Sequence, residues 1–250
     1  MKSPRFSIVC LTALLASAGI SRSAVVATYG SEFQGTAFPA GWQYLWNAPA
    51  GYNPGVSSGD GSAGAIGNPA NYVPLLWNGA DWTPDGDATT GNNQPAGFSR
   101  LGANLLHPAL GATQLGGVGN TLDRYIIMAY TIQPADGAGY YSITDSTIQR
   151  LQAGGNGTQA VAVLVHVNAN APVFGSGSIG TGDGVVSFNT SLGDLNVGDT
   201  VYVAVGPDGA AGTDSVGAFN FSLDRIPEPS AAAALLVATA IGLARRRRHR

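Results

Sequence analysis

The feature that most constrains the fold is a series of short apolar segments between residues 123 and 224, each bounded by turn residues. Four valines occupy every second position from Val161 to Val167. Alternate side chains of a β-strand point to the same face, so this pattern predicts a strand, over Ala160–Asn168, with one apolar face. Thr200–Gly206 repeats the alternation, and Arg124–Ile132 is apolar at nearly every position, which indicates a strand covered on both faces.

Further segments complete the predicted sheets. We predict strands at Gly139–Ile148, at Val185–Thr190 directly after the turn signal Asp183-Gly184, and around residues 219–223. Glycine and proline recur every few residues between positions 29 and 120, which favours short strands and long loops. The fold class is therefore predicted to be all-β, an antiparallel β-sandwich or jelly roll with a loop-rich N-terminal part.

The charge of the central region narrows the choice of partners. Residues 25–224 contain 14 acidic side chains, Glu32 and 13 aspartates, but only three basic ones, so their net charge is −11. Phosphate groups are bound by clustered lysine and arginine, which excludes nucleic acid as a partner. Neutral sugars and divalent cations remain compatible with this balance.

The N-terminus has the pattern of a secretory signal peptide. Lys2 and Arg5 precede the apolar stretch Phe6–Ile20, and small residues follow up to Ala24, where a signal peptidase could cut. The single cysteine, Cys10, lies inside this stretch, so the exported protein is predicted to lack disulfides.

The C-terminus combines three features in order. Pro227, Glu228 and Pro229 precede an uncharged Ala/Leu-rich run of 14 residues, Ala231–Ala244. A helix that spans a bilayer needs roughly 20 residues, so this run would make a marginal, transient anchor. A basic cap follows, which by the positive-inside rule should stay cytoplasmic. Its arginines are Arg245, Arg246, Arg247, Arg248 and Arg250.

This tail closely resembles the PEP-CTERM sorting signal of Gram-negative bacteria. In that family an exosortase, a membrane-embedded cysteine protease, recognises and processes the tail. Proteins of the family are typically found in species that export a polysaccharide matrix. The resemblance implies a signal helix at residues 1–24, a domain at 25–224 and a sorting signal with a short hydrophobic helix at 225–250. It also implies signal peptidase, secretion machinery and exosortase as partners, with transient inner-membrane anchoring before release to the cell surface, outer membrane or extracellular matrix.

Residues 123–224 also resemble the jelly-roll domains appended to secreted bacterial proteins, many of them carbohydrate-related. The aromatic segment upstream is expected to belong to the same unit. The segments that carry the resemblance are Tyr140–Ile143, Val161–Asn168, Leu195–Val201, Gly206–Gly209 and Asp214-Ser215, with Leu75–Trp77 and His107-Pro108 upstream.

All four tryptophans lie in the loop-rich part, at Trp42, Trp46, Trp77 and Trp82. An exposed aromatic ring suits the C–H face of a sugar, so these rings are candidates for a glycan-stacking platform. The alternative is that they fill the core and cover the ends of the sandwich.

Several Asp-Gly stretches could ligate calcium through carboxylates and loop carbonyls, with Asp85 and Asp87 the best candidates. The ligand pattern of an EF-hand is incomplete there, and Asp-Gly is also a common hairpin signal, so turns are the stronger interpretation. No other cofactor is predicted.

Catalysis has little support in the sequence. His107 and His166 have no nucleophile or metal ligand at a readable spacing, and Glu32 is the only glutamate of the central region. We therefore predict a non-catalytic exported surface or matrix protein that is structural, adhesive or associated with polysaccharide, as in a biofilm. The alternative is a secreted carbohydrate-active enzyme of the jelly-roll type, whose paired carboxylates would be recognisable only in space.

Overall fold

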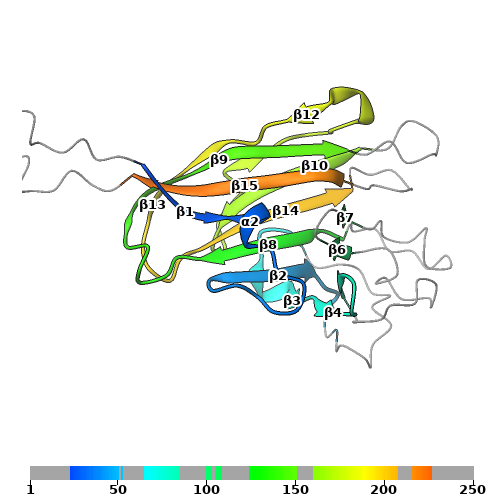
Figure 1. Cartoon of the computed structure of the whole chain (residues 1–250), viewed down its shortest axis with the longest axis horizontal. Helices are drawn as coiled ribbons and strands as arrows, with labels where there is room; N and C mark the ends of the chain where they lie inside the picture. The colour runs from blue at the N-terminus through cyan, green and yellow to red at the C-terminus, as the bar shows by residue number, and fades with distance from the viewer. Residues whose placement is uncertain are drawn as a thin grey trace, which may run out of the picture. The chain divides into compact units, whose positions relative to one another are not determined.

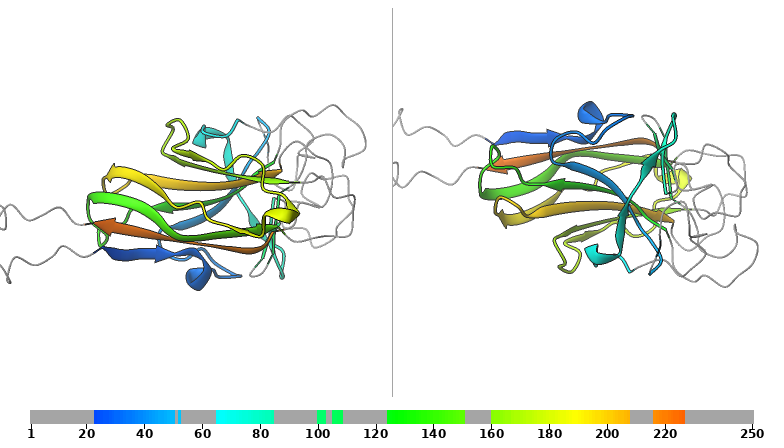
Figure 2. Two further views of the ribbon diagram at one scale, coloured as in Figure 1. Left: turned by 90° about the horizontal axis from the view of Figure 1, so that it is seen from above. Right: turned by 90° about the horizontal axis from the view of Figure 1, so that it is seen from below.

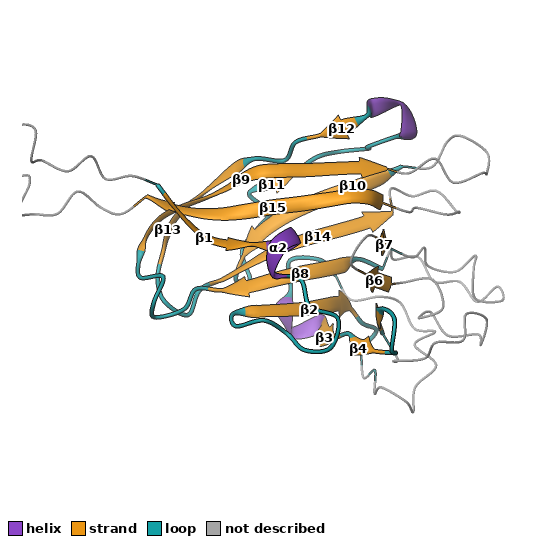
Figure 3. Cartoon of the chain, viewed as in Figure 1, coloured by secondary structure: helices purple, strands orange, loops and turns teal. Residues whose placement is uncertain are grey.

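Alternating apolar side chains build two antiparallel β-sheets that stack face to face (Figure 1 and Figure 2). The computed structural model describes residues 23–50, 52, 65–84, 100–102, 105–108, 124–150, 160–207 and 216–226. Within this part of the chain, Val25–Arg225 form one compact unit, to which the following description applies. Strand is the dominant secondary structure, as Figure 3 shows, which confirms the prediction of an all-β sandwich.

The first sheet, sheet A, has nine described strands, and β15 lies within it, paired with β9, β7 and β1. The second, sheet B, has the order β11-β10-β14-β8-β2-β3. The strands of sheet A are β1 (Ala24–Thr28), β4 (Leu76–Trp77), β5 (Trp82–Thr83), β6 (Arg100–Gly102), β7 (Leu105–His107), β9 (Gly139–Arg150), β12 (Val185–Val186), β13 (Thr190–Leu195) and β15 (Val216–Ile226). Those of sheet B are β2 (Trp42–Asn47), β3 (Tyr72–Pro74), β8 (Ile126–Thr131), β10 (Val161–Val167), β11 (Phe174–Gly175) and β14 (Thr200–Pro207). The short helices are α2 (Tyr29–Glu32), η1 (Pro69–Asn71) and η4 (Thr181–Asp183).

The predicted valine faces of β10 and β14 lie side by side on the inner face of sheet B. β10 and β14 pair in a register that sets Val163 opposite Val205 and Val165 opposite Val203. β8 and β2 continue the same rows with isoleucine, methionine and aromatic side chains, all buried against sheet A. Because side chains alternate between faces, a slip of one residue would expose the whole valine row, so the register is firmly set.

The outer face of sheet B is covered as well, which confirms the prediction that β8 is buried on both faces. Leu45, Ile127, Ala129 and Ala204 form a second apolar cluster there. Ile66, from the segment before β3, and Tyr72, the first residue of β3, pack against this cluster together with Tyr125, Leu164 and Tyr202.

The strand predicted at Val185–Thr190 is wrong as a single element. The chain forms the two-residue strand β12, leaves the ladder over residues 187–189, and begins β13 at Thr190. Both strands pair with β9, but β13 is displaced along it, with a bulge between Ser191 and Gly193. Phe188, which lies between the two strands, turns into the core and is fully buried.

The first and last strands of the domain are neighbours. The hydroxyl oxygens of Thr28 on β1 and Ser222 on β15 lie 3.1 Å apart, and the Gly30 N–H donates to Asn220 Oδ1 at 2.9 Å. Residue numbers rise along one strand as they fall along the other, so the start of β1 lies next to the end of β15 (Figure 1).

The predicted signal helix and hydrophobic C-terminal helix lie outside the described residues. Over the part of the chain that is described, no helix is long and apolar enough to cross a membrane.

Candidate functional site

Three of the four tryptophans are core residues. Trp42, Trp46 and Trp82 are each at most 5% exposed. Trp42 packs edge-on against Tyr130, with ring centroids 5.1 Å apart. The indole N–H of Trp82 donates to the Gln34 carbonyl oxygen at 3.0 Å. Burial of these three rings favours the interpretation that they fill the core. Trp77 is the half-buried one of the four tryptophans.

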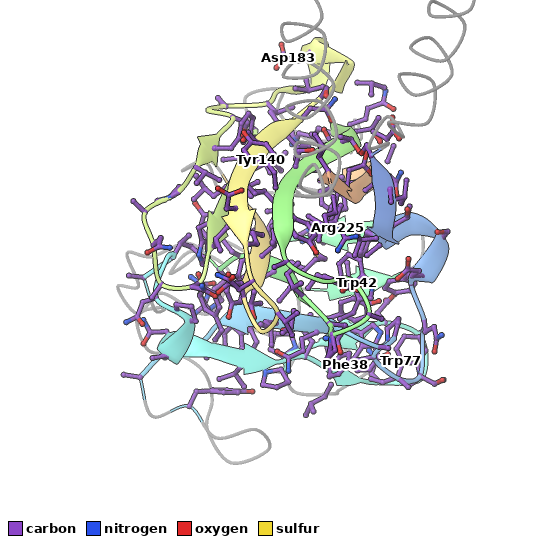
Figure 4. The ribbon with its side chains drawn as sticks, turned by 90° about the vertical axis from the view of Figure 1, so that its left-hand side faces the viewer. Phe38, Trp42, Trp77, Tyr140, Asp183 and Arg225 are labelled. Carbon is purple, nitrogen blue, oxygen red and sulfur yellow. The ribbon has the colours of Figure 1, made fainter. Side chains whose placement is uncertain are left out.

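Trp77, one of the four predicted stacking rings, lies near Phe38, a ring that sequence reasoning did not single out. Phe38 stacks on Trp82 with ring centroids 4.7 Å apart, and Trp77 packs on Trp82 at 5.6 Å. Phe38 is 36% exposed, and Leu76, next to Trp77, is 38% exposed. Figure 4 shows Phe38 and Trp77 at the same edge of the molecule, with Trp42 further inside. We call Phe38 and Trp77, supported by Trp82, the Phe38–Trp77 surface.

Glu32 holds the first helical turn and the core together. Its Oε1 accepts the backbone N–H of Thr28 at 2.8 Å, and its Oε2 accepts the indole N–H of Trp42, also at 2.8 Å. Both carboxylate oxygens are therefore occupied by structural donors. The only glutamate of the central region thus has a structural role in this arrangement.

His166 is fully buried on the outer face of sheet B. Its Nδ1–H donates to the Asn168 carbonyl oxygen at 2.8 Å, so Nε2 accepts the Tyr72 hydroxyl at 2.9 Å. Tyr72 in turn accepts the Gly67 N–H at 2.8 Å, and the imidazole stacks on Tyr202 at 4.7 Å. The chain of hydrogen bonds ties the covering segment to the sheet and is satisfied by a neutral imidazole protonated on Nδ1.

Burial lowers the pKa of His166, and the hydrogen bond to Asn168 opposes this only in part. An unfolded histidine titrates near pH 6.5, so just below that pH the unfolded chain takes up a proton that the folded chain refuses. The contribution to stability is therefore present above about pH 6.5 and is lost as the pH falls toward the lowered pKa. One proton corresponds to at most about 1.4 kcal/mol per pH unit.

We expect urea unfolding to show this loss between pH 7.5 and pH 5.5, and the His166→Gln variant to show a smaller pH dependence over the same interval. Equal pH dependence of the two proteins would contradict the assignment of the effect to His166.

The remaining candidate residues are not brought together. His107 is buried in β7, where the register pairs it with Arg100. Over the described ranges, no three His, Cys, Asp or Glu side chains gather in a group that could hold a metal ion. The candidate calcium ligands Asp85 and Asp87, the Pro227–Pro229 motif and the arginine cap all lie outside the described residues.

Comparisons of the chain with protein-family models, with curated proteins and with solved structures found no match. The function must therefore be argued from the residues themselves.

Proposed function

We propose that this chain is a non-catalytic exported protein that an exosortase sorts to the cell surface or extracellular matrix. The pairing of β1 with β15 is the observation that carries the proposal furthest. It sets the start of β1 next to the end of β15, the strands that follow the predicted leader and precede the predicted sorting signal in the sequence. Ile226, the last residue of β15, directly precedes Pro227 in the sequence.

The proposed role in the matrix is association with polysaccharide through the Phe38–Trp77 surface. Exposed aromatic rings stack on the C–H faces of sugars, and an apolar patch on a soluble domain is a common mark of an interaction site. The net charge of −11 over residues 25–224 favours neutral chains over anionic ones.

For the finer fold we propose the jelly-roll class. Support comes from the connections between the long strands, since β8–β9, β9–β10, β13–β14 and β14–β15 each pass from one sheet to the other. The alternative, a carbohydrate-active enzyme, would need two carboxyl groups facing one cleft about 5–10 Å apart. The engagement of both Glu32 oxygens gives that alternative no support.

Replacement of Pro227, Glu228 and Pro229 with alanine tests the sorting proposal in the native host. We expect the uncut precursor to accumulate in the inner-membrane fraction, and deletion of the exosortase gene to give the same pattern. A matched Ala231→Ser variant, outside the motif, should be sorted normally. Unchanged size and location of the motif variant would overturn the proposal.

The polysaccharide role has its own test. A Phe38→Ala, Trp77→Ala double variant should lose most of its retention on matrix isolated from the host, while Val173→Ala, at another exposed apolar position, should keep it. Full retention of the double variant would remove the Phe38–Trp77 surface from the proposal.

A further inference from the structure

A cavity of about 320 Å³ opens beside α2 on sheet A. It lies between the place where β1 ends at Thr28 and the place where β7 pairs with β15, at Val216 opposite Leu106. The chain turns into α2 at this point instead of continuing along β15. The cavity is thus a consequence of the topology of the sheet, and its volume is at the lower end of the range of roughly 300–1,000 Å³ for ligand pockets.

The walls combine apolar and polar groups. Tyr29, Leu106 and Phe219 supply rings and an aliphatic side chain, while Thr147 and Asn220 supply a hydroxyl and an amide. Asn220 Oδ1 accepts the Gly30 N–H, which fixes the orientation of the amide. Such a lining suits a ligand with an apolar face and several hydroxyl groups.

Small residues bring the backbone itself to the cavity. Gly102 and Gly217, both within strands, and Ala218 form part of the wall. Glycine weakens a strand interior, and its presence there often marks a place where a ligand approaches the backbone closely.

The charge pattern selects the class of ligand. Among the described residues, no lining side chain carries a charge, so neither a metal ion nor a phosphate finds a counter-charge in this part of the wall. The acidic domain around the cavity repels anions. We infer that the cavity beside α2 binds one uncharged sugar residue, with its hydroxyls toward Thr147 and Asn220. This inference rests on the proposed association with polysaccharide and assigns it a second, separate contact.

The test uses the full chain in mild detergent and saturation-transfer NMR with glucose, galactose, mannose and cellobiose, and with glucuronic acid as the charged comparison. We expect transfer to at least one neutral sugar and none to glucuronic acid. Ala218→Leu fills the cavity and should abolish the transfer, whereas Ala171→Leu, at an exposed turn, should not. Thr147→Val keeps the shape of the side chain and should weaken binding about 3- to 10-fold, the range expected for one lost hydrogen bond.

The outcomes separate this inference from the proposed function. Absence of transfer to every neutral sugar, or transfer that persists in a folded Ala218→Leu variant, would overturn the inference. If Ala218→Leu does not fold, an unchanged affinity of Thr147→Val overturns it instead. Retention on matrix through the Phe38–Trp77 surface is measured separately in the same variants, so that either result can fail while the other stands.

Discussion

Val163→Asp should prevent the domain from folding. Val163 is 0% exposed and lies in the middle of β10, opposite Val205 in the paired strand. An aspartate there would bury either a carboxylate without a counter-ion or an unpaired protonated acid, and both cost several kcal/mol. Typical domains are stable by only about 5–15 kcal/mol, so one such change removes most of the margin.

The measurement is near-UV circular dichroism and urea unfolding, with Val185→Asp as the matched control. Val185 carries the same side chain at 59% exposure in β12, and surface changes are usually within about 0.5 kcal/mol. We expect a cooperative transition for the control and none for Val163→Asp. Similar unfolding curves for the two variants would show that β10 does not face the core as described.

Phe221→Ala should lower the free energy of unfolding by about 3–5 kcal/mol, the usual cost of removing a buried phenylalanine ring. Phe221 is 2% exposed and contacts rings from both sheets and from α2. It stacks parallel to Tyr29 at 5.7 Å and packs edge-on to Trp42 at the same centroid distance. Its loss therefore leaves a cavity where three elements meet, and the surrounding rings can close it only in part.

Urea unfolding followed by tryptophan fluorescence gives this value, and Phe38→Ala is the control. Phe38 has the same side chain in a stacked but partly exposed setting, so its loss should cost clearly less than that of Phe221. The denaturant dependence should stay the same in both variants. A larger loss of unfolding free energy for Phe38→Ala than for Phe221→Ala would show that Phe221 does not lie at the centre of the aromatic core.

Local alternation predicted the strands that have one strong apolar face. The valine rows of β10 and β14 and the fully apolar β8 could be found from residue spacing alone, since side-chain periodicity reports burial directly. β13 was missed, because its Gly193 and Asp194 interrupt the alternation at the bulge. The order of strands within each sheet has no local signal in the sequence. β1 and β15 pair although they lie at opposite ends of the domain sequence, and no residue spacing in either segment predicts this pairing.

The candidate site shows the same limit. Nothing in the sequence around Trp77 distinguishes it from Trp42, Trp46 and Trp82. Only the packing of the two sheets decides which of these rings are buried. Phe38 had no pattern around it that set it apart from other loop aromatics. Its setting depends on Trp82 of the β4–β5 hairpin, which stacks on Phe38 although it lies far from it in the sequence.

The neighbourhood of the first and last strands also governs when the fold can be completed. The contact between Thr28 and Ser222 spans 194 residues, and such distant contacts cost loop entropy and slow the folding of a chain. A chain that leaves the ribosome or a translocation channel from its N-terminus must hold β1 without its partner until β15 emerges. β15, the last strand to appear, lies between β9 and β7 in sheet A, so the sheet is incomplete without it. Completion of sheet A is therefore tied to the appearance of β15, one of the last segments of the chain to be made.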